Sequence, residues 1–596
     1  MGFGGDRRRR LTEPPREALH GALLRARPVP RRPAAERETM STLRNNRTAL
    51  LAMLCCVLYL PFLGQAFHID DMGFIEPARQ IGWNPLRVNA PDGLTDGAAR
   101  PSSLAYGSTH AVLLPYYIKT ITAVFGEREA ALHASFLPFS VLGLACLGAL
   151  HARWFPGAGQ CTVWLVLLFS VIPAFLVSSH TIMSDVPTLT LLLLFHLVLL
   201  RNLETGRPVY AYAAGAVLLC AVFLSYQMLV FVPLGLFLAA ISRRMNIHTA
   251  LGLLSPVLLL CLWLLALYAR YGHLPITLQD FSVQGTGIAS EIRRGLRPEV
   301  FPGKVINIFA TLGSSLLFVY LVRTALTGSF PQALRRLFLA ALLSVVPVGL
   351  VARDYSVAEV AALTLLAALG LLIFWEVAAA ALAGKDGENR PRTVYLLAWS
   401  FTVIGYNILV MPFGAARYLL PALPPLMFLL LDVPAPVPSG GARRTAVVAV
   451  AAAAVLFGLA SSSADYAYAG VYRDFAGEVK RFRDNRPLSG TTWYIGKWGM
   501  QYYLEQAGCR RLPEQSTEPR KGDFIIIPEM PRFSQPAPGV TARMKFYASR
   551  EYRSPLPLRL FNRRSNAGFY AHHWGLLPFA FSREPDELFQ IWEVTS

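Results

Sequence analysis

The stretch "ALLAMLCCVLYLPFLGQAFHIDDMGFIEP", residues 49–77, joins an apolar run to a pair of neighbouring carboxylates. Its first part, Ala49 to Leu63, contains no charged side chain. Such a run approaches the length that a helix needs to cross the hydrocarbon of a membrane. Asp70 and Asp71 follow it almost at once. The two acids are therefore predicted to lie where a membrane helix meets water.

The composition extends this prediction from one helix to many. Of the 596 residues, 54% are hydrophobic and 16% are charged, and the mean hydropathy is +0.41. A soluble chain of this length needs more charge to cover its surface. The formal net charge of +19 is attributed to loops beside a membrane, where Lys and Arg collect, and not to nucleic-acid binding. The sequence predicts a polytopic α-helical membrane protein.

Apolar runs typical of membrane helices recur along the chain, and we predict about 13 spans. One further short run, 110–126, contains Lys119 and Pro115 and is predicted to lie along the outer membrane interface. The predicted spans are 49–66, 131–151, 161–178, 186–200, 209–224, 228–242, 248–270, 304–322, 336–352, 357–383, 393–411, 417–432 and 445–461.

Loop charges decide the orientation of these spans. If 110–126 does not cross, every basic cluster between spans falls on the side of the N-terminus, which is the positive-inside pattern. The N-terminus is then cytoplasmic and the C-terminus is external. The clusters are Arg153, Arg201 with Arg207, Arg243 with Arg244, Arg335 with Arg336, Lys385 with Arg390 and Arg392, and Arg443 with Arg444.

The chain divides into three predicted parts. Residues 1–48 carry twelve Arg against five acids and are predicted to be a disordered, basic cytoplasmic tail; whether translation starts at Met1 or Met40 stays open. Residues 49–463 form the membrane domain, including an external loop with interfacial helices, 67–130. Residues 464–596 contain strand-like "DFIIIP" and "LFQIWEV" and helix-like "MQYYLEQAG", which predict a small external α/β domain.

Three carboxylates are predicted on the external side: Asp70, Asp71 and Asp185. Asp185 precedes Val186-Pro187 at the start of a span, and Pro is tolerated in a first helical turn. Each acid could simply cap a helix, since Asp is a good N-cap residue. Alternatively, a carboxylate held near the bilayer surface can act as a general base. The residues alone leave both interpretations open.

Basic side chains are predicted on the same side. Arg417 and Tyr418 begin "RYLLPALPP" at the outer end of a late span. Such an Arg could snorkel to lipid headgroups, or its planar fork could bind a phosphate. Arg353 lies at a similar depth in "VARDYS", where it could instead pair with Asp354. Each of these alternatives stays open.

The order of these motifs resembles a known family. The acidic pair, the "LLPYY" helix, the "MSDVP" span start and the late "RYLLPALP" are similar to the polyprenyl-phosphate-sugar-dependent glycosyltransferases of the GT-C fold. The nearest branches resemble bacterial relatives of protein O-mannosyltransferases and of the lipid A aminoarabinose transferase. The resemblance covers roughly 45–435. It implies a bacterial inner-membrane enzyme, with the C-terminal domain periplasmic or extracellular.

The family's essential acid in the first external loop corresponds to Asp70 and Asp71. Its second external acid corresponds to Asp185, and its late Arg-Tyr corresponds to Arg417 and Tyr418. The family's first loop often has Asp-Glu where this chain has Asp-Asp. A donor-phosphate group of Arg417, Tyr418 and Arg353 is expected.

Polar residues elsewhere are expected to line the cavity. Many family members carry Lys-Pro or His-Pro-Pro before the interfacial helix, whereas "GSTHAVLLPYY" keeps only His110 and Pro115. Tyr226 and Gln227 interrupt two apolar runs, as polar residues beside a membrane cavity do.

The resemblance implies inverting transfer of a sugar from a polyprenyl-phosphate donor to a hydroxyl of a protein, lipid or glycan acceptor, with an Asp as the base. A flippase for lipid-linked sugars and a non-catalytic membrane scaffold are the alternatives. No cofactor is certain. Adjacent acids can bind a divalent cation, so a metal requirement stays open.

Overall fold

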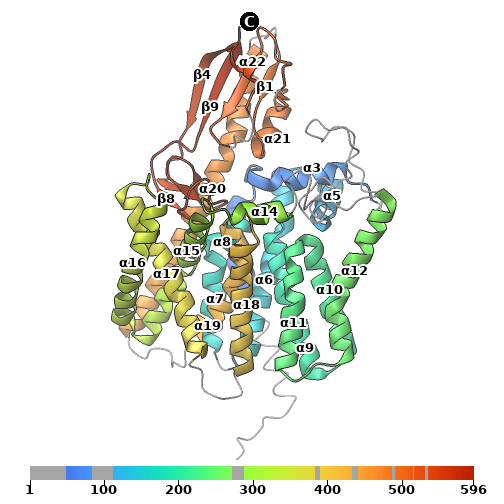
Figure 1. The fold of residues 1–596 in the computed structure, drawn as a ribbon, viewed down its shortest axis with the longest axis vertical. Helices are drawn as coiled ribbons and strands as arrows, with labels where there is room; N and C mark the ends of the chain where they lie inside the picture. Colours follow the sequence, from blue (N-terminus) through green and yellow to red (C-terminus); the bar gives the residue numbers. More distant parts are fainter. Residues whose placement is uncertain are drawn as a thin grey trace, which may run out of the picture. The chain divides into compact units, whose positions relative to one another are not determined.

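Helices dominate the part of the chain that the structure describes (Figure 1). The computed structural model describes residues 49–83, 112–156, 158–271, 288–382, 390–432, 441–485, 490–513, 516–530 and 535–595. The predicted tail 1–48 and His110 lie outside these ranges. Thr48–Ser596 form one compact unit.

Seven helices within the described ranges are long and apolar enough to cross a membrane. They are α6 (Glu129–Trp154), α9 (Asp185–Thr205), α12 (Ile247–Tyr271), α15 (Phe301–Thr327), α16 (Phe330–Val351), α17 (Val357–Leu382) and α20 (Gly441–Asn485).

Six shorter apolar helical segments accompany them within the same ranges. They are Ala49–Phe62, which ends in η1 (Val57–Phe62), α5 (Leu113–Phe125), α7 (Gly159–Val171), α10 (Pro208–Leu224), η3 (Tyr226–Val230) with α11 (Phe231–Ile241), and η4 (Ala416–Ala422) with α19 (Leu423–Leu431). The remaining helices of this region are η2 (Ile69–Asp71), α3 (Met72–Gln80), α8 (Pro173–Ser178), α14 (Ile288–Gly295) and α18 (Arg390–Leu409).

All thirteen predicted spans are helical over most of their described length, and the predicted class of polytopic helical membrane protein is confirmed. The set of predicted spans and the set of apolar helical segments in the structure differ in one member. The more polar α18 occupies the predicted span 393–411 but is not among the strongly apolar helices, whereas α5 is. The 13 residues of α5 span about 20 Å at the usual rise, which is less than the roughly 30 Å of hydrocarbon. Its interfacial position stays a prediction.

Close glycine contacts explain how α15 and α17 pack side by side. A Cβ on Gly313 would lie 2.0 Å from the Leu366 carbonyl oxygen, and one on Gly370 would lie 2.0 Å from the Phe309 carbonyl oxygen. Neither site has room for a side chain. Small residues let membrane helices approach closely, so that dispersion contacts and backbone packing hold them together.

A histidine inside the bundle makes the contact expected of a buried polar residue. His196 of α9 accepts or donates a 2.7 Å hydrogen bond with the Tyr395 hydroxyl of α18 and stacks on Trp399 at 4.1 Å between ring centroids. The bond satisfies polar atoms that are costly to bury alone.

The last apolar helix continues into the C-terminal region without a break. The predicted domain boundary at 463–464 falls inside α20, which runs over 45 residues. Its second half buries Tyr468, Tyr472 and Phe475, and Phe475 stacks on Phe589 of the sheet at 3.8 Å. One helix therefore joins the membrane part to the C-terminal domain.

The C-terminal domain is a mixed sheet with short helices, as predicted. Its strand order is β2-β1-β3-β9-β4, with β1 parallel to β2 and β3, and β9 antiparallel to β3 and β4. The predicted "DFIIIP" and "LFQIWEV" strands and the "MQYYLEQAG" helix are confirmed as β3, β9 and α21. The elements are β1 (Thr492–Tyr494), α21 (Gly499–Gln506), β2 (Arg510–Arg511), β3 (Phe524–Pro528), α22 (Pro538–Thr541), β4 (Met544–Tyr552) and β9 (Glu587–Val594).

Two small ladders lie between β4 and β9 in the sequence. β5 (Leu558–Arg559) pairs with β8 (Ala580–Phe581), and β6 (Phe561–Asn562) pairs with β7 (Ala567–Gly568). Leu576 and Leu577, which lie between these strands, share a buried cluster with Ala310 of α15, Val348 of α16 and Leu363 of α17. The C-terminal domain thus packs directly on the ends of membrane helices.

Candidate functional site

A short irregular segment presents the two predicted acids in different directions. Ile69 has a φ of +45°, a conformation that is strained for a β-branched residue. The turn is fastened by Asp71, whose Oδ2 accepts from the His68 backbone N–H at 3.0 Å and whose Oδ1 accepts from the Ile182 N–H at 2.8 Å. Asp71 is fully buried. Its two carboxylate oxygens therefore hold the backbone at His68 and at Ile182 in place.

Asp70 faces the other way, toward the late Arg-Tyr motif. Its Oδ2 accepts a hydrogen bond of 2.6 Å from Nη2 of Arg417 in η4, and the pair is ionic. The Asp70 side chain is 31% exposed and that of Arg417 is 7% exposed. Asp70 is thus the accessible member of the acidic pair.

The Arg417 guanidinium has N–H donors that lack a strong acceptor. Its Nη1 contacts the Met183 sulfur at 2.7 Å, and Nη2 also reaches the Tyr418 hydroxyl at 3.4 Å. Nε is buried and has no hydrogen-bond partner within the described residues. A guanidinium has five N–H donors, and a thioether is a weak acceptor. The group can therefore still bind an anion.

Asp185 completes the group as the first residue of α9. Its carboxylate interacts electrostatically with both Arg417 and Asp70. Two acids and one guanidinium thus come together from three distant parts of the chain. The structure gathers Asp70, Asp185, Arg417 and Tyr418, which are four of the residues predicted from the sequence.

Three arginines of the predicted basic clusters, Arg153, Arg201 and Arg392, lie near the other end of α9. This helix has 21 residues and spans about 30 Å, with Asp185 at its start. Near its end, Glu204 pairs with Arg153, and Arg392 donates to the Trp154 carbonyl. The candidate site and these cationic groups therefore lie at opposite ends of the helix bundle.

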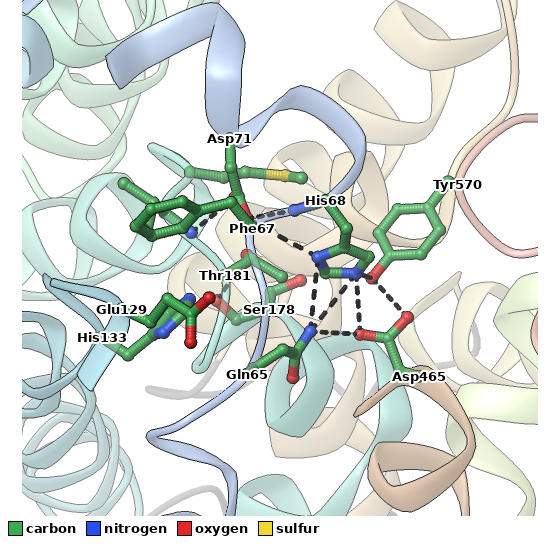
Figure 2. A network of polar contacts seen from close by, with 12 residues as sticks. Gln65, Phe67, His68, Asp71, Glu129, His133, Ser178, Thr181, Asp465 and Tyr570 are labelled. Carbon is green, nitrogen blue, oxygen red and sulfur yellow. Dashed lines mark hydrogen bonds and ion pairs between the residues drawn. The ribbon is translucent and has the colours of Figure 1, made fainter. Parts of the chain in front are cut away.

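A buried polar network surrounds His68, beside Asp71 (Figure 2). The His68 ring Nε2 is 3.0 Å from Asp465 Oδ2 and 3.2 Å from the Tyr570 hydroxyl. Gln65 and Tyr570 each donate to Asp465, at 2.9 and 2.8 Å. Burial by itself lowers the pKa of His68, but Asp465 and Asp71 outweigh it and raise the pKa to about 10. The ring is a buried cation held between two carboxylates.

Other predicted site residues lie elsewhere. Arg353 is exposed and its Nε donates to the Leu350 carbonyl at 3.0 Å; within the described ranges it makes no ion pair with Asp70 or Asp185. The reason is that α16 ends at Val351, and the turn that follows points this side chain to solvent. Arg353 is therefore not part of the gathered group.

Of the two predicted cavity residues that the structure describes, one lines the cavity beside Tyr418 and the other does not. Gln227 lines a small cavity together with Tyr418, Tyr406 and Asn407, whereas Tyr226 is not among its lining residues. Asn407 Oδ1 is buried there without a partner in the described part of the chain. The predicted role of His110 falls outside the described residues.

Sequence reasoning missed several residues around the site. His68 lies two positions before Asp70, but nothing in its spacing indicates a partner almost 400 residues away. Lys304 is buried and donates to the Met411 carbonyl at 3.0 Å. Its place as the first residue of the predicted span 304–322 was its only signal, because a buried Lys at a membrane helix calls for a partner or a function. Within the described residues, no group of three or more His, Cys, Asp or Glu side chains is arranged so that it could hold a metal ion.

The fold and the site define a multi-pass helical membrane protein with a carboxylate–guanidinium group at one end of its bundle. No protein-family model matches the chain, and no curated protein matches it. Among solved structures, it is similar to ArnT from Cupriavidus metallidurans bound to undecaprenyl phosphate, with 15% identity and a TM-score of 0.37 over 84% of this chain and 95% of that chain. The apo state of ArnT matches over the same shares with 15% identity and a TM-score of 0.39.

Proposed function

We propose that this chain is a membrane glycosyltransferase. It moves a sugar from a polyprenyl-phosphate donor to an acceptor hydroxyl on the outer face of a bacterial plasma membrane, with inversion at the anomeric carbon. The observation that carries the proposal is the pairing of Asp70 with Arg417 at the ends of membrane helices. The acceptor is a protein, lipid or glycan that carries a free hydroxyl.

The position of the site suits such a donor. A polyprenyl-phosphate sugar keeps its tail in the hydrocarbon and its sugar at the interface, so the reacting atoms stay at the depth of helix ends. Asp185 at the start of α9 and Arg417 at the start of η4 lie at that depth. Because Arg153, Arg201 and Arg392 lie near the opposite end of α9, the positive-inside rule supports an external site.

Arg417 is the proposed clamp for the donor phosphate. Its unused Nε and the neighbouring Nη2, which now donates to Asp70, present two parallel N–H groups that suit two phosphate oxygens. As the bond from the anomeric carbon to the phosphate oxygen breaks, the guanidinium stabilises the negative charge that gathers on the leaving phosphate.

Asp70 is the proposed general base. When a phosphate engages Arg417, the partly exposed carboxylate of Asp70 is freed in part and is available to the acceptor. It takes the proton of the acceptor hydroxyl as the new bond to the anomeric carbon forms. Asp185 positions the sugar or the acceptor. Asp71 is not proposed as the base, because both of its oxygens accept backbone N–H groups.

The test is transfer by the purified full-length chain in proteoliposomes that contain a radiolabelled polyprenyl-phosphate hexose. Protein, lipid and glycan acceptors are supplied in parallel, each with a chelator or with added Mg²⁺ or Mn²⁺. Label on an acceptor that disappears in Asp70→Asn supports the proposal. Movement of the donor across the bilayer without transfer would indicate a flippase. Donor binding with neither outcome would indicate a scaffold.

A further inference from the structure

Both halves of the Asp70–Arg417 pair lie on short segments with little regular structure. Asp70 belongs to η2, a three-residue turn, and Arg417 follows the irregular residues 410–415 at the start of η4. Such segments have few backbone hydrogen bonds of their own, so their geometry depends on what packs against them. Partners of both segments come from the C-terminal region.

The first segment is held by α21 of the C-terminal domain. A Cβ on Gly499 would lie 1.7 Å from the Phe67 carbonyl oxygen and 3.1 Å from the His68 Cα, so this glycine lets α21 press on the backbone just before Asp70. The Tyr503 hydroxyl accepts from the Phe67 N–H at 2.8 Å and itself donates to Glu129 of α6.

The polar network adds a second hold on the same segment. His68 is fastened by Asp465 of α20 and by Tyr570, which follows β7 (Figure 2). These contacts, with the Asp71 bonds, surround the strained Ile69. A strained residue persists only where its surroundings over-determine it. The contacts from the C-terminal region therefore help to fix the direction in which Asp70 points.

The second segment is held by residues that follow β7. The His572 N–H donates to the Gly414 carbonyl at 2.9 Å, and the Gly414 N–H donates back to His572 Nδ1 at 3.0 Å. Two residues on, the Ala416 N–H donates to the Phe569 carbonyl at 2.9 Å. These three bonds fasten the backbone immediately before Arg417.

The same stretch is fixed to the membrane helices. Asn307 of α15 donates to the Leu576 carbonyl at 3.0 Å, and the Leu576 N–H donates to the Tyr355 hydroxyl at 2.9 Å. The stretch is thus tied both to the bundle and to the backbone beside Arg417. This stretch can therefore hold the backbone before Arg417 at a fixed position relative to the membrane helices.

We infer that the C-terminal domain is a positioning part of the transfer site, and that Gly499, Tyr503, Asp465 and His572 set the relative placement of Asp70 and Arg417. This inference rests on the proposed function and deepens it, by giving the C-terminal domain a role in the reaction. A displacement of about 1 Å in a reacting group can cost on the order of 10²-fold in rate. The positioning residues therefore act through Asp70 and Arg417 without touching the substrate.

The first experiment compares Gly499→Ala with Gly470→Ala in the full-length chain. Gly470 lies in α20, where an added Cβ would meet nothing within 4 Å, so its substitution is the matched control. Gly499→Ala should raise hydrogen exchange in the peptide 65–72 and lower kcat by roughly 10- to 100-fold, with little change in donor KM. Gly470→Ala should match the wild type in hydrogen exchange and in kcat.

The second experiment uses His572, in case Gly499→Ala fails to fold. In His572→Asn an amide oxygen can replace Nδ1 as the acceptor for the Gly414 N–H, whereas His572→Leu has no acceptor. The Asn variant should recover most of the kcat that the Leu variant loses, and only the Leu variant should expose the peptide 412–418 to exchange.

The two proposals fail in different ways. The wild type could transfer no sugar while hydrogen exchange in the variants changes as expected. The proposed function would then be wrong, but the C-terminal domain would still hold the backbone around Asp70 and before Arg417. If the wild type is active but Gly499→Ala and His572→Leu leave both exchange and kcat unchanged, the positioning role is overturned.

Discussion

Nη2 of Arg417 lies 2.6 Å from Oδ2 of Asp70, although the two residues are 347 positions apart. The two side chains form an ion pair that joins the first external turn to the start of η4. The pair leaves Arg417 Nε without a hydrogen-bond partner among the described residues. An anion that binds Arg417 must therefore change the environment of Asp70, which couples the donor site to the base.

Asp70 and Asp71 should differ when each is changed to Asn. Asp70→Asn removes the base and should lower turnover by about 10²–10⁴-fold, with the melting temperature nearly unchanged. Asp71→Asn keeps one acceptor oxygen and loses a backbone bond, so it should destabilise the fold by about 1–3 kcal/mol. Turnover and thermal melting of both variants check this. Equal loss of turnover without destabilisation in Asp71→Asn would contradict the assignment.

Arg417→Lys should keep the charge but lose much of the function, because an ammonium cannot form the parallel fork. Arg417→Ala should lose more, since hydrogen bonds to charged groups contribute about 1.5–3 kcal/mol each. Donor affinity and turnover are the measurements. Arg353→Lys, at an exposed site, is the matched control and should behave like the wild type. Full activity in Arg417→Lys would leave only a headgroup contact for this residue.

The His68 cation should make stability depend on pH. Its pKa of about 10 lies above the ordinary value of 6.5, so its stabilising effect is complete below pH 6.5 and is lost as the pH rises through about 10. The melting temperature of the wild type should exceed that of His68→Gln most at pH 6.5, and the difference should shrink toward pH 10. A constant difference would contradict a charged His68. The titratable groups that interact with His68 are Asp71, Asp465, Tyr570, His133 and His180.

The orientation is testable with reporter fusions in a bacterial host. Alkaline phosphatase is active only outside the cytoplasm, so a fusion after Ser596 should be active and a fusion after Arg244 should be inactive. The physical reason is that Arg-rich loops stay in the cytoplasm. The reverse result would place the candidate site on the cytoplasmic side and would remove the support for an external donor.

The sequence by itself determined the class of this protein. Hydropathy and residue preference are local properties, so long apolar runs indicated the helices, and short runs rich in Ile, Phe and Trp indicated β3 and β9. It also nominated Asp70, Asp185, Arg417 and Tyr418, because polar residues at helix ends stand out against apolar surroundings. These predictions needed no knowledge of which segments touch.

Only the tertiary structure decided which of two adjacent acids faces Arg417. Asp70 and Asp71 have the same chemistry, and a turn at Ile69 with φ of +45° sends one outward and buries the other. Only the structure brought His572 to Gly414 and Asp465 to His68. These contacts join residues far apart in the chain, where no periodic signal reaches, and they depend on how whole helices pack and where the C-terminal domain returns to the bundle.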